Sequence, residues 1–473
     1  MTQLSRRQFL SRTGAFGATA SLATLASSSV LRAAAANTSG YKALVCIYLN
    51  GGMDHSDSII PYDQTSWTTL SNTRTSLFSA YNASQSSSSR NRANLLKLNP
   101  TNASSLGGRE FSMPPQLAPL HNAFEAGDLA IVGNVGPLEQ PTTRAQVDAG
   151  TAKLPPRLGS HNDMASMWTS LGVEGTRLGW GGQFADAAMA SAPSDDPTFA
   201  AVTTGLNNPF LAGNTVRPFR VSSDNGLVPE VVSKTFLLGG NTTDMTIRGQ
   251  LKDYLAAPGF NEQNYYAADY TAARSRSIEN SQRMLDARAA ASGFATAFPN
   301  EPLGRQLKLI AETINIQSAL NISRQVFFVN VGGFDTHSGQ TSTLPALQST
   351  LANALGALRS ALQEVGQWAN TTVFTASDFG RAMIDNGDGT DHGWGGHHMV
   401  MGGAVNGQRI YGQLPSANTQ NGSYMPGRAA MIPAVSVEQY AATLGSWFGL
   451  TSSELATIFP NLSRFNQANL GFV

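Results

Sequence analysis

The chain has 473 residues, of which 41% are apolar and 13% charged, and it contains 46 glycines, 22 prolines and a single cysteine. This composition excludes a collagen, a coiled coil and a disulfide-stabilised scaffold, while the length allows one large α/β domain or about two to three smaller ones. Residues 1–36 hold four arginines and no acid, so residues 37–473 carry 27 basic and 31 acidic side chains. This slight acidic excess gives no bulk attraction to nucleic acid, and we expect no nucleic-acid partner.

The first 36 residues have the pattern of an export signal. The sequence SRRQFL at residues 5–10 precedes a weakly apolar stretch and a run of four alanines that ends at Ala36. This order is typical of a cleavable twin-arginine signal peptide, whereas an amphipathic first helix would need a polar face. We therefore expect cleavage near Ala36, the twin-arginine translocase as a partner during export, and a periplasmic or secreted mature protein.

The remaining chain, residues 37–473, predicts one elaborated α/β domain. Short apolar runs at residues 43–49, 325–331 and 371–375 are typical of strands buried on both faces of a parallel sheet. The sole cysteine, Cys46, lies in the first run and is expected to pack in the core. No later segment approaches the roughly 20 apolar residues that cross a bilayer, so we expect no stable membrane span.

Helices and loops are expected between these strands. Leucines at three- and four-residue steps predict a core-facing helix over residues 344–368, and residues 267–291 and 303–320 also fit helices. Residues 82–102 are rich in Ser and Asn and predict an exposed insertion. Residues 190–260 predict short strands and loops that elaborate the sheet.

Polar residues with ligating side chains follow each predicted strand. In open α/β sheets, sites collect at the carboxyl ends of the strands, so these residues are expected to meet in one pocket. Carboxylates and imidazoles that converge there supply oxygen and nitrogen ligands for a divalent ion such as Zn, Mn, Ca or Mg. The candidate metal ligands are Asp54, His161, Asp335, His337, Asp378, His392 and His397.

Several of these residues have a structural interpretation as well. Asp54 and Asp378 each fit a helix N-cap, and Asp335 with His337 fits a turn in which a carboxylate holds an imidazole. His397 is adjacent to a second histidine, and at most one of the two is expected to be a ligand.

Ser160 is a candidate nucleophile at the start of a predicted helix. A helix N-terminus favours anions, which would suit an alkoxide or a bound phosphate or sulfate group. Asp163 follows three residues later, so Ser160 is equally interpreted as an ordinary N-cap in a capping-box arrangement.

The motifs together resemble a known family. The sequences LNGGMD at residues 49–54, GFDTH at 333–337, SDFGR at 377–381 and GTDHG at 389–393 are similar to the bacterial family of unknown function numbered 1501. That family is grouped with the alkaline phosphatase and sulfatase-like superfamily. The resemblance implies a three-layer α/β/α sandwich with a largely parallel central sheet and a metal centre at its carboxyl edge.

The resemblance also implies roles for particular residues. By position, Asp54 resembles the first-strand metal aspartate of the superfamily, Ser160 its nucleophile, and His392 its late histidine. Asp335 and His337 resemble its central Asp/His pair. Phe379 stands where the superfamily has a histidine, which weakens a second metal site unless His161 or His397 substitutes.

Two functions are therefore expected from the sequence. The first is an exported metal-dependent hydrolase of phosphate or sulfate esters, acting on a small-molecule or glycan ester. In it the ion, assisted by Arg381, neutralises the ester, and His392 is a ligand or general acid. The alternative is a catalytically degenerate member that binds an anionic glycan, a lipid headgroup or a partner protein.

Overall fold

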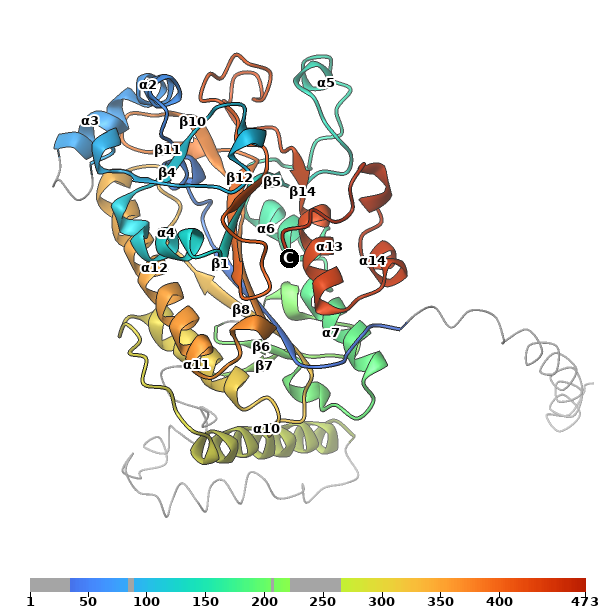
Figure 1. The fold of residues 1–473 in the computed structure, drawn as a ribbon. Coiled ribbons are helices and arrows are strands. Elements are labelled where there is room, and N and C mark those ends of the chain that lie inside the picture. Colours follow the sequence, from blue (N-terminus) through green and yellow to red (C-terminus); the bar gives the residue numbers. More distant parts are fainter. Residues whose placement is uncertain (1–34, 84–88, 206–207, 222–264) are drawn as a thin grey trace, which may run out of the picture.

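The computed structural model describes residues 35–83, 89–205, 208–221 and 265–473 (Figure 1). The predicted signal peptide lies almost wholly outside these residues. A nine-stranded sheet has the order β13-β5-β12-β9-β1-β8-β6-β7, with β14 beside β5. Its strands are β1 (Lys42–Leu49), β5 (Leu129–Gly136), β6 (Ala201–Thr203), β7 (Phe219–Arg220), β8 (Arg324–Val331), β9 (Thr371–Ser377), β12 (Gly396–Gly402), β13 (Arg409–Gly412) and β14 (Val435–Ser436).

The sheet is mostly parallel. Strand β1 pairs in parallel with β8 on one side and with β9 on the other, and β5 is parallel to β13 and β14. Strand β12 is the exception, because it runs antiparallel to both of its neighbours, β5 and β9. The chain is therefore a mixed α/β protein with a large, mostly parallel central sheet.

Helices cover both faces of this sheet (Figure 1). On one face lie α4 (Ala118–Glu125), α11 (Pro302–Asn315) and α12 (Gln340–Glu364), and on the other lie α6 (His161–Ser170), α7 (Trp180–Ser191), α13 (Val437–Phe448) and α14 (Ser452–Ile458). The helices α2 (Gln64–Thr73), α3 (Thr75–Ala83), α5 (Arg144–Asp148) and α10 (Tyr265–Ala290) lie further out, as do the small sheets β2 (Ile60–Pro61)-β4 (Phe111–Met113)-β3 (Leu96–Lys97) and β10 (Arg381–Asp385)-β11 (Thr390–His392).

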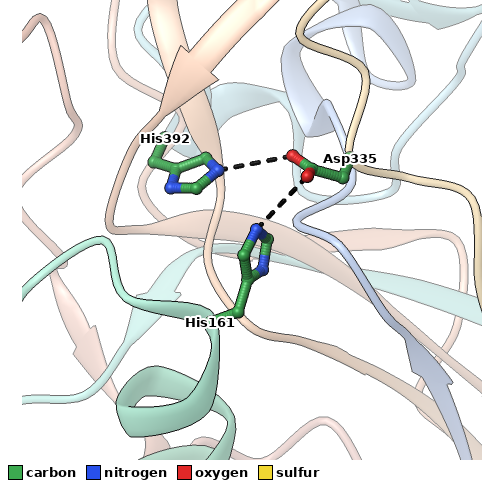
Figure 2. Close-up of side chains that lie close together, drawn as sticks. All are labelled: His161, Asp335 and His392. Carbon is green, nitrogen blue, oxygen red and sulfur yellow. Dashed lines mark hydrogen bonds and ion pairs between the residues drawn. The ribbon is translucent and has the colours of Figure 1, made fainter.

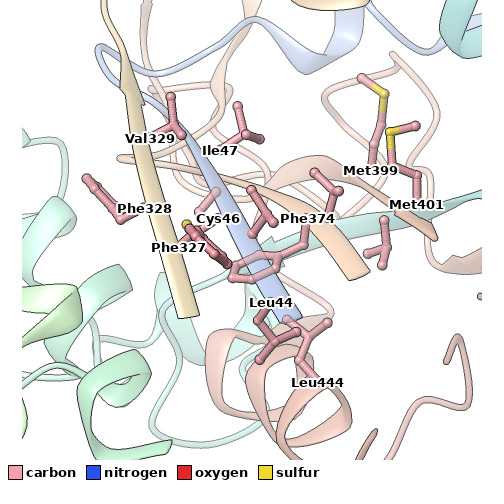
Figure 3. Close-up of a cluster of buried hydrophobic side chains, with 14 of the residues drawn as sticks. Leu44, Cys46, Ile47, Phe327, Phe328, Val329, Phe374, Met399, Met401 and Leu444 are labelled. Carbon is pink, nitrogen blue, oxygen red and sulfur yellow. The ribbon is translucent and has the colours of Figure 1, made fainter. Parts of the chain in front are cut away.

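Apolar side chains on both faces of the central strands form the main core (Figure 3). Leu44, Cys46 and Phe327 are at most 1% exposed, and Phe374 and Leu444 are fully buried beside them. Each fully buried side chain of this size stabilises the fold by about 1.5–3 kcal/mol. Burial on both faces explains why these strands are continuous apolar runs rather than alternating patterns.

The register of the strands places three loops at one edge of the sheet. Leu49 at the end of β1 is paired with Val331 of β8 and with Ser377 of β9. The three parallel strands therefore end at the same level, and the segments that follow them leave the sheet side by side. The polar motifs at residues 49–54, 333–337 and 377–381, which follow these strands, therefore lie at the same edge of the sheet.

Most predicted elements are found, with one correction. The three predicted helices correspond to α12, α11 and α10, and β6 and β7 extend the sheet within the described part of residues 190–260. Residues 84–88 and 222–264 of the predicted loops lie outside the described residues. The expected exposed insertion at 82–102 is confirmed only in part where it is described, because Asn82, Asn91 and Lys97 are exposed whereas Arg90 is fully buried and paired with Asp57.

In the described part of the chain, we find no helix with both the length and the apolar character that a bilayer crossing requires.

Candidate metal centre

Three side chains from separate elements meet at the carboxyl edge of the sheet. His161 is the first residue of α6, Asp335 follows β8, and His392 ends β11. One ligand atom from each lies within 4.8 Å of the others. Figure 2 shows both imidazoles directed at the carboxylate of Asp335. We call these three residues the triad.

The dimensions of the triad fit a divalent ion. Nε2 of His161 is 3.5 Å from Oδ2 of Asp335, and Nε2 of His392 is 3.3 Å from Oδ1. Two ligand atoms each about 2.1 Å from a tetrahedral ion would lie roughly 3.4 Å apart, so these two separations need little adjustment, whereas ligand atoms as far apart as 4.8 Å would have to move closer together. Two imidazoles with one carboxylate are ligands that suit Zn²⁺ or Mn²⁺. The triad side chains are 25–48% exposed, so the site is open to solvent.

Hydrogen bonds orient both imidazoles. Nδ1 of His161 lies 2.6 Å from Oδ2 of Asp378, which also accepts a hydrogen bond from the backbone amide of Gly51. Nδ1 of His392 donates to the carbonyl oxygen of Gly159 over 2.7 Å. These partners hold the proton of each neutral ring on Nδ1, so each Nε2 presents a lone pair toward Asp335. Such outer partners are typical of metal-ligating histidines.

Two buried atoms beside the triad lack hydrogen-bond partners among the described residues. These are Nε2 of His161 and Oδ1 of Asp378. An unsatisfied buried polar atom usually destabilises the fold by about 1–3 kcal/mol, so a missing partner here requires an explanation. A cation between the two imidazoles and Asp335 would satisfy the lone pair of His161, and the donor set therefore fits the ion that the sequence predicts.

His337 borders the triad. Its Nε2 is 2.8 Å from Nε2 of His392 and 3.3 Å from Oδ1 of Asp335, while its Nδ1 is 3.4 Å from Oδ1 of Asp391. Two imidazole nitrogens at hydrogen-bond distance share one proton, because two lone pairs would repel. His337 is therefore placed either to add a ligand or to exchange a proton with His392.

Burial and neighbouring charges shift the pKa values of the triad in different directions. The hydrogen bond to Asp378 raises the pKa of His161, although desolvation opposes it. Desolvation lowers the pKa of His392, and the positive charge of Arg381 adds to this effect. Burial would raise the pKa of Asp335, but the hydrogen bond and charge of Arg381 outweigh it and lower that pKa. Asp335 is consequently an anion at neutral pH.

Arg381 differs from the free cation that was expected to neutralise an ester. Its side chain is fully buried, and it donates hydrogen bonds to backbone carbonyl oxygens in two loops and at the start of β11, and to the carboxylate of Asp335. The carbonyl groups belong to Gly51, Gly52, Phe334 and Thr390. Arg381 therefore joins the loops at this edge and holds Asp335 in place.

Phe379 forms an apolar wall against the triad. Its ring is 1% exposed and lies 4.9 Å from the ring of His161 and 4.4 Å from that of His392, between ring centres. A phenyl ring has no ligating atom. The position at which the resemblance calls for a histidine therefore packs against the site and cannot extend it to a second ion.

Asp54 does not belong to the triad, contrary to the expectation from the resemblance. Its Oδ2 accepts hydrogen bonds from Nη1 of Arg74 at 2.5 Å and from Nε2 of Gln340 at 2.7 Å. Arg74 also donates to the carbonyl oxygens of Ala382 and Met383. Asp54, Arg74 and Gln340 are all buried. Asp54 and Arg74 form an ion pair that attaches the end of α2 to the sheet edge, so the charge of Asp54 is already compensated.

His397 is also placed apart from the triad. It lies with His55 and His398 in a cluster of imidazoles that are at most 5% exposed, and its Nδ1 accepts a hydrogen bond from the backbone amide of Asn134. Desolvation lowers the pKa of His55 to about 4 and that of His397 to about 3, so both are neutral. Among the described residues, these three do not form a group of metal donors.

Ser160 caps α6. Its hydroxyl accepts from the backbone amide of Asp163 and donates to the carboxylate of that residue at 2.8 Å. The contacts of Ser160 are those of an ordinary helix N-cap, and its hydroxyl proton already has an acceptor in Asp163.

Sequence reasoning missed the groups that hold these side chains. Gly159 acts through its carbonyl oxygen, which no residue-type pattern reveals. Arg74 lies between α2 and α3 and Gln340 is the first residue of α12, and a polar residue at a helix end is ordinarily solvent-exposed. Only their burial in the folded chain identifies them.

Comparison with known proteins places this chain in a family. It belongs to the family described as protein of unknown function (DUF1501), whose model matches residues 41–425. No curated protein matches the chain in sequence. Among solved structures, Ps i-CgsB in complex with k-i-k-neocarrahexaose is similar at a TM-score of 0.31 and 10% identity, covering 91% of this chain and 77% of that one. A second structure of Ps i-CgsB is similar at a TM-score of 0.29 and 10% identity, covering 89% of this chain and 77% of that one. Scores this low carry no functional argument.

Proposed function

We propose that the chain is an exported, metal-dependent hydrolase of phosphate or sulfate esters with an alkaline phosphatase-like fold. One observation carries this proposal. Two imidazole nitrogens and a carboxylate, supplied by three elements far apart in sequence, gather within 4.8 Å at the carboxyl edge of a mostly parallel sheet. Open α/β sheets bind their ligands at this edge.

The residues of the site suit such hydrolysis. A divalent ion held by His161, Asp335 and His392 would neutralise ester oxygens and make bound water more acidic near neutral pH. Asp335 contributes the negative charge that attracts the ion, and Arg381 keeps that carboxylate ionised and in place. Phe379 excludes water from one side of the imidazoles, which strengthens electrostatic interactions there.

Proton transfer is assigned to His337. Its side chain is 44% exposed, within reach of a substrate, and its Nε2 faces Nε2 of His392. Oδ1 of Asp391 lies 3.4 Å from Nδ1, and a proton carried by the ring can pass to the leaving alcohol. Water is the proposed nucleophile, because the hydroxyl of Ser160 is already bound to Asp163.

Turnover of generic aryl phosphates and aryl sulfates by purified protein supplied with Zn²⁺ or Mn²⁺ tests this function. We expect hydrolysis of one ester class, its loss on chelation, and its loss in Asp335→Asn. The exposed Asp286 of α10 supplies the matched control, Asp286→Asn, which should retain turnover. Metal-independent hydrolysis, or hydrolysis that survives Asp335→Asn, would contradict the proposal.

A second function is favoured by Phe379. Because this residue stands in place of a ligand, the site resembles a degenerate member that binds an anionic glycan, a lipid headgroup or a partner protein without chemistry. Metal-dependent binding of inorganic sulfate or phosphate without turnover of any aryl ester would support this function over hydrolysis.

A further inference from the structure

A cavity of about 370 Å³ lies beside the triad. Its volume is within the range of small-molecule sites, which usually have mainly apolar walls. This cavity differs, because more than half of its lining side chains are polar. Six of these side chains together provide both hydrogen-bond donors and acceptors: Arg144, Asp385, Asn386, Asp391, Gln420 and Arg428.

Two contacts connect the cavity lining to residues that border the triad. Asp391 lines the cavity and lies 3.4 Å from Nδ1 of His337, whose Nε2 faces the triad. In the second contact, Nη1 of Arg428 donates to the carbonyl oxygen of Leu158. The next residue, Gly159, holds His392 through its own carbonyl oxygen. A molecule that reaches from the triad past His337 would therefore enter this cavity.

The polar groups of the cavity retain hydrogen-bonding capacity. Arg144 is bound through Nε to Asp148 and through Nη1 to the carbonyl oxygen of Tyr424, and Arg428 is bound through Nη1. A guanidinium has five N–H donors, so these contacts leave donors for a ligand. Asp385 and Asp391 supply acceptors, and the amide of Gln420 supplies both.

We propose that this cavity binds the alcohol portion of the ester, and that this portion is a polyhydroxylated group such as a sugar. The assignment rests on the proposed hydrolase and names the substrate class of the same site. Each hydroxyl of a sugar both donates and accepts a hydrogen bond, which matches walls that offer guanidinium, carboxylate and amide groups. An aryl or alkyl group satisfies fewer of these wall groups, so its alcohol should bind less tightly than a sugar, while an activated aryl ester can still react at the metal centre.

Binding of neutral probes tests the cavity separately from chemistry. Saturation-transfer NMR of the metal-free mature protein would compare glucose, galactose and mannose with cyclohexanol and benzyl alcohol. Two variants alter the cavity. Arg428→Ala removes a donor, and Gln420→Leu removes an amide from an exposed residue at nearly constant size. The control, Arg409→Ala, removes an exposed arginine of β13 that does not line the cavity.

We expect at least one of the three sugars to bind more tightly than both apolar alcohols. Its affinity should fall about tenfold in Arg428→Ala and in Gln420→Leu, which corresponds to roughly 1.4 kcal/mol, and stay unchanged in Arg409→Ala. Failure of all three sugars to bind, tighter binding of the apolar alcohols, or sugar binding that both cavity variants retain would overturn the assignment.

The outcome also separates this assignment from the hydrolase. If sugars bind in the expected way while no ester is turned over, the cavity stands and the proposed chemistry fails. If aryl esters are hydrolysed while no sugar binds, the chemistry stands and the cavity assignment fails.

Discussion

Nδ1 of His161 lies 2.6 Å from the fully buried carboxylate of Asp378, and this contact directs the other ring nitrogen toward Asp335. In Asp378→Asn an amide oxygen can still accept from His161 and Gly51, but the negative charge is lost. Because outer carboxylates increase the basicity of a ligating imidazole, metal affinity should fall about 10–100-fold with the fold retained. Competition with a chelator measures this affinity.

Asp286→Asn, on the exposed side of α10, is the control for that substitution and should bind metal like the unmodified protein. Unchanged affinity in Asp378→Asn would mean that Asp378 serves the fold alone.

Asp54 should be essential for stability rather than for metal binding. Asp54→Ala leaves the buried guanidinium of Arg74 without its counter-charge, which should lower the free energy of unfolding by about 3–5 kcal/mol. Glu110→Ala breaks an exposed ion pair with Lys97 and should change the free energy of unfolding by less than about 1 kcal/mol. Denaturant titration gives both values. Loss of bound metal in folded Asp54→Ala, with stability maintained, would restore Asp54 as a ligand.

Ser160→Ala separates a cap from a nucleophile. Loss of the hydroxyl that caps α6 should lower the free energy of unfolding by about 1 kcal/mol, with kcat unchanged. Thr451→Ala, which removes the cap of α14, should have a similar effect on stability. If kcat for an aryl ester instead fell by about 10⁴-fold or more, Ser160 would be the nucleophile.

The buried histidines predict how stability depends on pH. In the folded state the pKa of His55 is about 4 and that of His397 about 3, below their ordinary value of 6.5. Below pH 6.5 the unfolded chain therefore binds protons that the folded chain does not, and stability should decrease as pH falls from 6.5 to 4. Each histidine contributes at most about 1.4 kcal/mol per pH unit.

Denaturant titrations at several pH values measure this slope. His55→Asn removes one titrating ring. The dependence of the free energy of unfolding on pH should therefore become less steep, by at most about 1.4 kcal/mol per pH unit, whatever the effect of the substitution on stability at pH 7. An identical slope in the variant would show that His55 does not remain neutral in the folded chain.

The central strands were predictable because burial on both faces leaves continuous apolar runs in the sequence. The approach of Asp335 and Asp378 to one edge followed from this, since parallel strands carry their following loops to the same side. His161 and His392 were recognisable as candidates by residue type, but α6 and the β10–β11 hairpin place them through long-range packing that no local pattern records.

The differences between the expected and the observed contacts have a common physical cause. Asp54 and Arg90 belong to buried ion pairs whose partners, Arg74 and Asp57, are 20 and 33 residues away in the chain. Arg381 is committed to backbone carbonyl groups, which are present at every residue and therefore leave no signature. A charged residue in a polar segment looks like a functional group in the sequence, and only burial shows that it stabilises the fold.

Metal content tests the central claim most directly. The unmodified protein, His392→Ala and Asp286→Asn would each be purified from metal-replete medium, dialysed and analysed for bound metals by mass spectrometry. We predict one tightly bound divalent ion per chain in the unmodified protein and in Asp286→Asn, and its loss from folded His392→Ala. An unmodified protein that binds no divalent ion, or a folded His392→Ala that keeps it, would contradict the assignment of His161, Asp335 and His392 as a metal centre.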